Sequence, residues 1–239
     1  RVDRRWVPTE SGTLALQLAE RVETEVLGSS ALITGQDKAL TGTVRLSSVA
    51  FVINCLLAPE VDSFVRRYPG LNLEMLATPE NLDLRKLQAE IALRLARPRD
   101  PNAVTRRIAT IHYQVYVAKR FIRRSRDLPW VAIDSSLGKT PEAKWVQSQL
   151  GKSKDASNNK PALRVSDSYA MATIAMTTPC RVLLPVAMAR LFPDLVPVAG
   201  SIPVLTRDLW LVYMKAMRGN ARIAAVNKWI TAACDAVQL

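Results

Sequence analysis

The first strong hydrophobic pattern is a helical stripe over residues 13–33. Its apolar positions recur every four residues, at Leu14, Leu18, Val22 and Val26. Thr9, just before the stripe, can cap a helix with its hydroxyl. A single helix with such a stripe must bury it, and a partner helix from a second chain is the economical solution. Packing against its own domain is the alternative. Gly28 and Gly35 loosen the later turns and argue against a long regular coiled coil.

From residue 43 onward, strand and helix patterns alternate. Short apolar or alternating runs predict strands over residues 43–46, 71–76, 91–95, 111–118, 130–133, 163–165, 182–184 and 209–213. Capping residues, prolines and glycines bound predicted helices over 49–68, 78–88, 141–149, 168–176 and 222–237. Ser47 and Ser48 are expected to cap the first of these. The alternation predicts an α/β fold with parallel strands and right-handed crossovers.

In open α/β sheets, ligands bind at the carboxyl ends of the strands. Hydroxyl and carboxyl side chains follow four predicted strands there: Ser47, Ser48, Thr78, Asp134, Ser135, Ser166 and Asp167. Hydroxyls beside free helix-end amides suit a carboxylate or another small anion. The two aspartates would favour a polar or cationic group. The alternative is that each residue only caps a helix. Arg94 could neutralise an acidic ligand, although its alternation with two leucines could also turn it outward.

Charge adds a partner class to this picture. The 239 residues carry a net charge of +12, which suggests a polyanionic partner or an acidic ligand. Residues 94–126 contain ten basic residues and one acid. They could contact a DNA backbone or form an ordinary solvated surface, because Pro98, Pro101 and an apolar strand interrupt them.

Catalytic and metal-binding signatures are missing from the sequence. It contains no G-x-S-x-G, P-loop, G-x-G-x-x-G or H-E-x-x-H motif, and His112 is its one histidine. Cys55, Cys180 and Cys234 are widely spaced, so we expect buried reduced thiols rather than a disulfide or zinc site. We therefore expect no enzyme activity, no metal and no cofactor. No run approaches the roughly 20 apolar residues of a membrane helix, and we expect a cytoplasmic protein.

Several segments, in this order, resemble the LysR-type bacterial transcription regulators. They are Thr9-Glu10-Ser11-Gly12, Leu40-Thr41-Gly42-Thr43-Val44-Arg45-Leu46, Phe64-Val65-Arg66-Arg67-Tyr68-Pro69-Gly70-Leu71-Asn72-Leu73-Glu74, Ile91-Ala92-Leu93-Arg94-Leu95-Ala96-Arg97-Pro98, Leu183-Leu184-Pro185 and Leu209-Trp210-Leu211-Val212. Each segment alone is weak, and their order and spacing along nearly the whole chain carry the resemblance.

The resemblance implies a specific domain organisation. Residues 1–8 would be the remnant of a winged helix-turn-helix wing, with Arg1, Arg4 and Arg5 contacting the DNA backbone. Residues 9–38 would form the linker helix that dimerises. Residues 39–239 would be the effector-binding domain, with two Rossmann-like lobes of the type 2 periplasmic-binding-protein kind. Lobe I would comprise 43–110 and 214–239, and lobe II 111–213. The effector would lie in the cleft between the lobes.

Three positions depart from the family pattern. Pro8 replaces the usual apolar residue, and Glu90 replaces an aspartate. Residues 176–181 replace a glycine-rich turn, so the loop of the second lobe should differ there.

The resemblance implies a ligand-responsive regulator that binds DNA in its full-length form. Its expected partners are a small-molecule effector and further copies of itself, in a homodimer or homotetramer formed through the linker helix and effector domains. RNA polymerase is a further candidate, and no membrane contact is expected. A solute-binding protein of a transporter, which shares the two-lobed fold, is the alternative.

Overall fold

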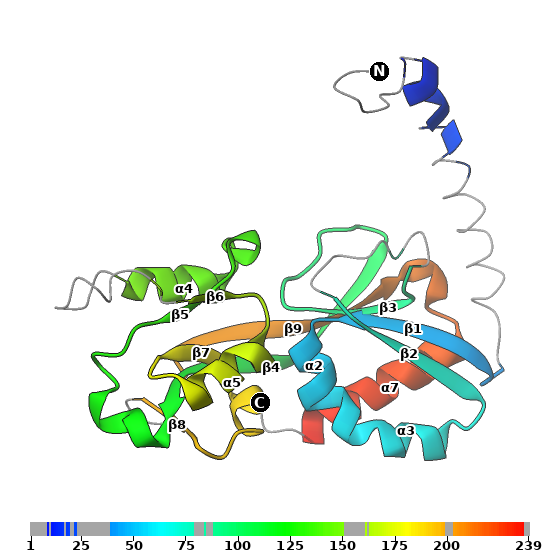
Figure 1. Ribbon diagram of the computed structural model, residues 1–239. Coiled ribbons are helices and arrows are strands. Elements are labelled where there is room, and N and C mark those ends of the chain that lie inside the picture. The colour runs from blue at the N-terminus through cyan, green and yellow to red at the C-terminus, as the bar shows by residue number, and fades with distance from the viewer. Residues whose placement is uncertain are drawn as a thin grey trace.

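A computed structural model describes residues 9, 11–16, 18–19, 22, 39–78, 84, 88–150, 161, 163–198 and 203–236. Most of the predicted helix over residues 78–88 lies outside this set, as does much of the predicted linker helix. The described part folds into two lobes that share one seven-stranded sheet, in the order β2-β1-β3-β9-β4-β7 with β8 added to β4 (Figure 1).

The elements of lobe I follow the predicted alternation closely. They are β1 (Gly42–Ser48), α2 (Ala50–Val52), a π-helical turn (Ile53–Leu57), a 3-10 turn (Ala58–Glu60), α3 (Val61–Arg67), β2 (Leu71–Ala77), β3 (Ile91–Arg94) and, at the end of the chain, a 3-10 turn (Lys215–Met217) and α7 (Ala221–Ala236). β1 pairs in parallel with both β2 and β3, as predicted from the strand-helix-strand pattern. The helical run after β1 covers nearly the predicted residues but is irregular, and Pro59 lies in its 3-10 turn.

The elements of lobe II lie between the two long strands. They are a 3-10 turn (Lys119–Arg124), β5 (Val131–Ile133), a second 3-10 turn (Ser135–Leu137), α4 (Pro141–Gln149), β6 (Leu163–Val165), α5 (Ser168–Thr177), β7 (Val182–Pro185), α6 (Val186–Ala189) and β8 (Leu195–Pro197). β5 and β6 form a separate parallel pair. A parallel bridge between Trp130 and Arg181 connects this pair to the strand that continues as β7.

Two long antiparallel strands carry the chain between the lobes. β4 (Ala103–Ala118) pairs with β9 (Leu205–Met214), and a register shift between Arg107 and Ala109 interrupts their ladder. The lobe boundaries expected at 110/111 and 213/214 therefore fall inside continuous strands. β4 was predicted only from residue 111, because its first half contains polar residues and two arginines. The same two strands thus position side chains at the centre of the molecule.

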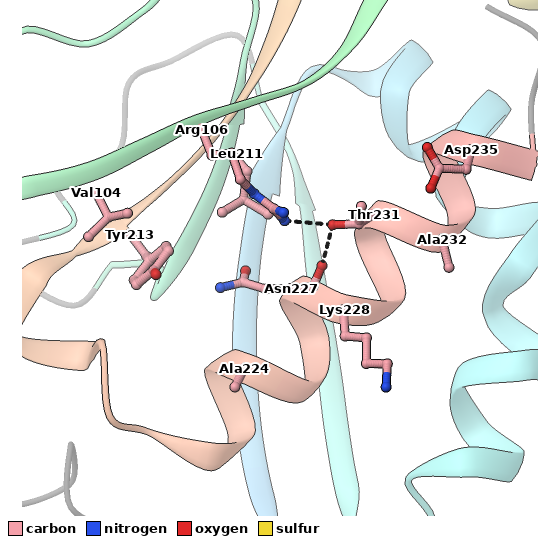
Figure 2. A pocket seen from close by; sticks show the side chains of 10 residues that line it. All are labelled: Val104, Arg106, Leu211, Tyr213, Ala224, Asn227, Lys228, Thr231, Ala232 and Asp235. Carbon is pink, nitrogen blue, oxygen red and sulfur yellow. Dashed lines mark hydrogen bonds between the residues drawn. The ribbon is translucent and has the colours of Figure 1, made fainter.

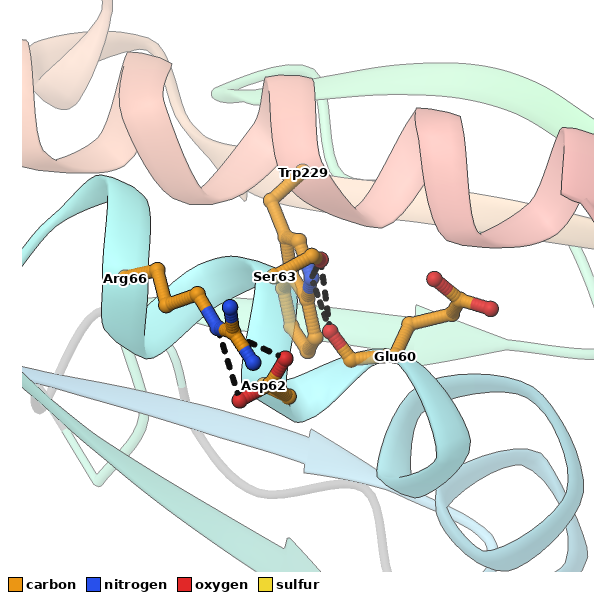
Figure 3. A network of polar contacts seen from close by, with 5 residues as sticks. All are labelled: Glu60, Asp62, Ser63, Arg66 and Trp229. Atoms are coloured by element: carbon orange, nitrogen blue, oxygen red, sulfur yellow. Dashed lines mark hydrogen bonds and ion pairs between the residues drawn. The ribbon is translucent and has the colours of Figure 1, made fainter.

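The core of lobe I packs the sheet against α7 and the helices after β1. Phe64, Leu93, Leu211 and Ile230 are fully buried there. Trp229 on α7 packs its ring 5.0 Å from that of Phe64, and its Nε1 donates to the carbonyl of Glu60 at 3.1 Å and to the hydroxyl of Ser63 at 3.2 Å (Figure 3). α7 and α3 are thereby held together by both apolar and polar contacts.

A second cluster of buried residues fills lobe II. It joins Tyr116, Val131, Met171, Cys180 and Val182 from five different segments. Cys55, Cys180 and Cys234 are all buried free thiols, as predicted.

Candidate functional site

A cavity of about 240 Å³ opens between the two lobes. From lobe I it is lined by the start of α2, by Thr78 after β2 and by Leu95 after β3. From lobe II it is lined by residues that include Leu137, Ser166 and Asp167, and Tyr113 of β4 also lines it. Polar residues that follow two different strands, β2 in lobe I and β6 in lobe II, therefore line one cavity, which is the arrangement expected at the carboxyl ends of parallel strands.

A larger pocket of about 720 Å³ adjoins this cavity and shares Thr78, Leu95 and Leu137 with it. Its walls include four arginines, Arg94, Arg97, Arg99 and Arg207, and two acids, Asp100 and Glu142. The excess of cations gives this larger pocket a positive potential, which favours an anionic ligand.

A buried ion pair connects the lobes beside the cavity. Nη1 of Arg207 on β9 lies 2.8 Å and 2.9 Å from the carboxylate oxygens of Glu142 on α4. Nη2 of Arg207 donates to the carbonyl of Leu95 in lobe I at 3.1 Å. Burial raises the pKa of the nearby Tyr113 hydroxyl, and the negative charge of Glu142 raises it further. This tyrosine therefore remains a neutral hydrogen-bonding group.

Arg94 differs from Arg207 because its hydrogen-bond partners among the described residues are all neutral. Its guanidinium donates to the carbonyl of Ser47 at 3.2 Å, to the hydroxyl of Ser47 at 3.0 Å and to the carbonyl of Leu93 at 3.2 Å. Burial lowers the pKa of the Arg94 guanidinium. A partly buried cation held by neutral groups at a pocket wall is suited to binding an anion.

The predicted site residues of lobe I fall into two groups. Thr78 lines both pockets. Ser47 and Ser48 are completely buried within β1, and Ser48 donates to the carbonyl of Leu93 at 3.3 Å. The expectation that they cap the following helix is wrong, because Val49 is the N-cap of α2 and no side chain caps it. The strand continues through both serines because it pairs with β2 on one side, and Ser47 also pairs with β3. Ser47 contributes instead by holding Arg94.

In lobe II, Ser166 and Asp167 line the inter-lobe cavity. Asp167 is also the N-cap of α5, since its carboxylate accepts from the amide of Ala170 at 2.8 Å. Asp134 caps the 3-10 turn Ser135–Leu137 by accepting from the amide of Ser136 at 2.9 Å, and Ser135 is exposed. The turn that they form places Leu137 at the cavity wall. Hydrogen bonds to Ser136 lower the pKa of the Asp134 carboxyl.

The ten basic residues of 94–126 do not form one stripe. Arg94, Arg97 and Arg99 surround the larger pocket. Arg106 and Arg107 lie on β4, where Arg107 pairs with Asp208 at 3.5 Å. The remaining five lie in and just after the 3-10 turn of lobe II. Arg1, Arg4 and Arg5, predicted to contact DNA, lie outside the described residues.

Sequence reasoning missed Glu142 and Arg207. Glu142 has the pattern of an ordinary first-turn acid after Thr140 and Pro141, and Arg207 lies in a strand without a local signal. They are 65 residues apart, so no local pattern could have joined them. In the part of the chain that the structure describes, no cluster of His, Cys, Asp and Glu could hold a metal ion, and no helix has the length and apolarity to cross a membrane.

Comparison with known proteins adds a family to this geometry. Residues 37–235 match the family model described as the LysR substrate binding domain. An HTH-type transcriptional regulator of Xanthomonas campestris pv. campestris (strain 8004) is 27% identical over 52% of this chain and 36% of its own length. The Mau operon transcriptional activator of Paracoccus denitrificans is 26% identical over 59% and 49%, respectively. The matched part therefore spans less than half of these relatives.

Solved structures show the same fold. CrgA, a LysR-type transcriptional regulator from Neisseria meningitidis, superposes with a TM-score of 0.66 at 17% identity, covering 97% of this chain and 82% of its own. The Vibrio cholerae virulence activator AphB gives a TM-score of 0.63 at 15% identity with the same coverage. The two-lobed, periplasmic-binding-protein-like architecture is thus shared.

Proposed function

The chain belongs to the LysR substrate-binding domain family, and we propose that it is the effector-binding portion of a ligand-responsive transcription regulator. The effector is a small organic anion that binds in the cavity between the lobes. One observation carries this proposal: Thr78 of lobe I and Ser166 and Asp167 of lobe II line a single cavity. A ligand that contacts both lobes binds their closed arrangement more tightly, so it shifts the equilibrium between lobe arrangements.

The anionic character of the effector rests on Arg94. Glu142 already compensates the charge of Arg207, whereas Arg94 bonds to backbone and hydroxyl oxygens among the described residues. A carboxylate that extends from the inter-lobe cavity into the adjoining larger pocket, which Arg94 lines, would give Arg94 a charged partner without disturbing the ion pair. Ser47 would then act indirectly by fixing the orientation of the guanidinium, and direct contacts would come from Thr78, Ser166 and Asp167.

DNA binding by the full-length protein and self-association complete the proposed function. The relatives named above are transcriptional regulators, and this chain matches only part of each. The apolar stripe of the N-terminal helix supports dimerisation, because Leu14, Leu18 and Val22 are each more than half exposed in the single chain. A transporter's solute-binding protein would not need this exposed stripe.

A thermal-shift screen of the chain against small organic acids tests the effector proposal. A true effector raises the melting temperature in a concentration-dependent manner. Thr78→Val and Arg94→Gln should abolish that shift, whereas Arg66→Gln, which removes an exposed arginine on α3, should retain it. Equal shifts in all four proteins would place the ligand elsewhere and contradict the proposed cavity.

A further inference from the structure

A second groove lies on lobe I, away from the inter-lobe cavity. It has a volume of about 620 Å³ and runs between α7 and the strands β4 and β9 (Figure 2). Its strand side is formed by Val104, Arg106, Leu211 and Tyr213. None of these residues lines the inter-lobe cavity or the larger pocket beside it. The groove has the size of a small-molecule site.

Asn227 supplies an unusual polar group in this groove. Its Oδ1 is buried and has no hydrogen-bond partner among the described residues. Figure 2 shows its carboxamide directed from α7 toward the strand side chains. A buried acceptor without a partner is costly, and a donor from a ligand would satisfy it.

Arg106 on β4 supplies a cation to the same groove, beside the next turn of α7 after Asn227. Its Nη2 donates to the hydroxyl of Thr231 at 2.6 Å, and among the described residues it forms no ion pair with an acid. A guanidinium has five N–H donors, so several remain for a ligand. Thr231 follows Asn227 by four residues, so the two side chains are neighbours on one helix face, about 5–6 Å apart at their Cβ atoms.

We propose that this groove binds an α-amino acid with an apolar side chain. The carboxylate pairs with Arg106, and the ammonium group donates to Oδ1 of Asn227. The apolar side chain packs against Val104, Leu211 and Tyr213. Arg106 and Asn227 line one groove beside an apolar wall, and Arg106 bonds to Thr231 one turn from Asn227. A cation and a hydrogen-bond acceptor arranged in this way suit the carboxylate and ammonium groups of an α-amino acid.

This site is independent of the proposed effector cavity. A ligand bound there would act on the rest of lobe I through α7. Trp229 lies on another face of the same helix and holds α7 to α3 (Figure 3). A ligand wedged between α7 and the strands therefore contacts the helix whose packing supports α3. A ligand in this groove would therefore change the packing of α7 and α3 in lobe I rather than the closure of the two lobes.

Isothermal titration calorimetry of this chain with three related probes tests the proposal. L-Phenylalanine has all three features, 3-phenylpropionate lacks the ammonium group, and 2-phenylethylamine lacks the carboxylate. We expect saturable binding of L-phenylalanine and affinities at least about tenfold weaker for the other two, since each loses a charge-assisted hydrogen bond. Equal binding of all three, or no binding of L-phenylalanine at millimolar concentration, overturns the proposal.

Variants locate the binding. Arg106→Gln and Asn227→Leu should each weaken L-phenylalanine binding by about tenfold or more. Arg107→Gln is the matched control, because Arg107, the neighbour of Arg106 on β4, pairs with Asp208 instead. Thr78→Val reports on the effector cavity, and it should leave the affinity unchanged. Loss of binding in Thr78→Val with retention in Asn227→Leu overturns the second site while supporting the first.

One further variant keeps the test independent of folding defects. Asn227→Asp preserves the size of the side chain and places a negative charge next to the expected position of the ligand's ammonium group. We expect it to bind 2-phenylethylamine more tightly than the parent does and 3-phenylpropionate less tightly. An unchanged ranking of these two probes would exclude the ammonium contact.

Discussion

Nη1 of Arg207 donates to both carboxylate oxygens of Glu142, at a place where neither side chain is more than 12% exposed. The pair joins β9 to α4, and the same arginine reaches the carbonyl of Leu95 in the other lobe. In an ion pair this deeply buried, each charge is shielded from water and depends on the other for compensation.

Removal of one partner of this pair should be strongly destabilising. Glu142→Ala leaves the charge of Arg207 buried without compensation, and we expect the free energy of unfolding to fall by about 3 kcal/mol. Urea denaturation measures this change. Asp62→Ala is the control, because it breaks an ion pair with Arg66 whose side chains are 72% and 79% exposed, and it should cost less than about 1 kcal/mol. Similar losses in both variants would contradict the assigned role of burial.

The three thiols should make stability fall in alkaline solution. Burial raises the pKa of Cys55 and of Cys180 from 9.0 to about 11, and that of Cys234 to about 12. The folded state thus retains thiol protons that the unfolded state releases. The resulting stability is fully present below pH 9 and is lost as the pH rises toward 11 and 12.

Thiol labelling at pH 8 and unfolding curves between pH 8 and 11 check this prediction. Labelling should follow the rate of unfolding rather than the ordinary reactivity of an exposed thiol, because buried thiols carry little thiolate. Cys55→Ala should flatten the alkaline decline. Rapid labelling of all three cysteines in the folded protein would show that the thiols are accessible.

The parallel strands and most helices were predictable because their signals are local. Apolar runs mark β1, β2 and β3, and Thr140 with Pro141 marks the start of α4. The first half of β4 was missed because it lies at the sheet edge in lobe I, where Arg106 and Arg107 are exposed and the apolar pattern is weak. Strand pairing over long distances, rather than composition, fixes that segment.

The sequence was sufficient to predict that the candidate site lies at the ends of particular strands. It was not sufficient to predict which side chains contact one another there. Thr78, Ser166 and Asp167 do line one cavity. Ser47 and Ser48 have the sequence pattern of a helix cap, yet they remain in the strand because β2 pairs alongside them. Arg207 and Glu142 meet only in three dimensions.

Trp229 provides a test of how α7 is held on lobe I. Its side chain is 5% exposed and makes two hydrogen bonds through Nε1 (Figure 3). Trp229→Phe keeps an aromatic ring but removes the donor, so we expect a loss of about 1 kcal/mol. Trp229→Ala removes the ring as well and should cost about 3–5 kcal/mol. Chemical denaturation compares the two variants, and equal losses would mean that the aromatic ring adds nothing beyond its hydrogen bonds, which would contradict the packing role.

The N-terminal helix provides the sharpest test of self-association. The hydroxyl of Thr9 accepts from the amide of Gly12 at 3.1 Å, so this residue caps the helix as predicted. Leu14, Leu18 and Val22 then form a stripe with four-residue spacing, and each is 58–59% exposed. A stripe of this kind requires an apolar partner. Leu18→Glu should therefore convert dimers into monomers, which sedimentation velocity would resolve.

Leu16→Glu is the matched control for this experiment. Leu16 is 57% exposed and lies two positions away, which places it on nearly the opposite side of the helix. A dimer that pairs through the stripe should tolerate a charge there. Dissociation by both substitutions would point to unfolding of the helix rather than loss of an interface, and circular dichroism would separate these outcomes. Retention of the dimer in Leu18→Glu would assign self-association to the effector domains alone.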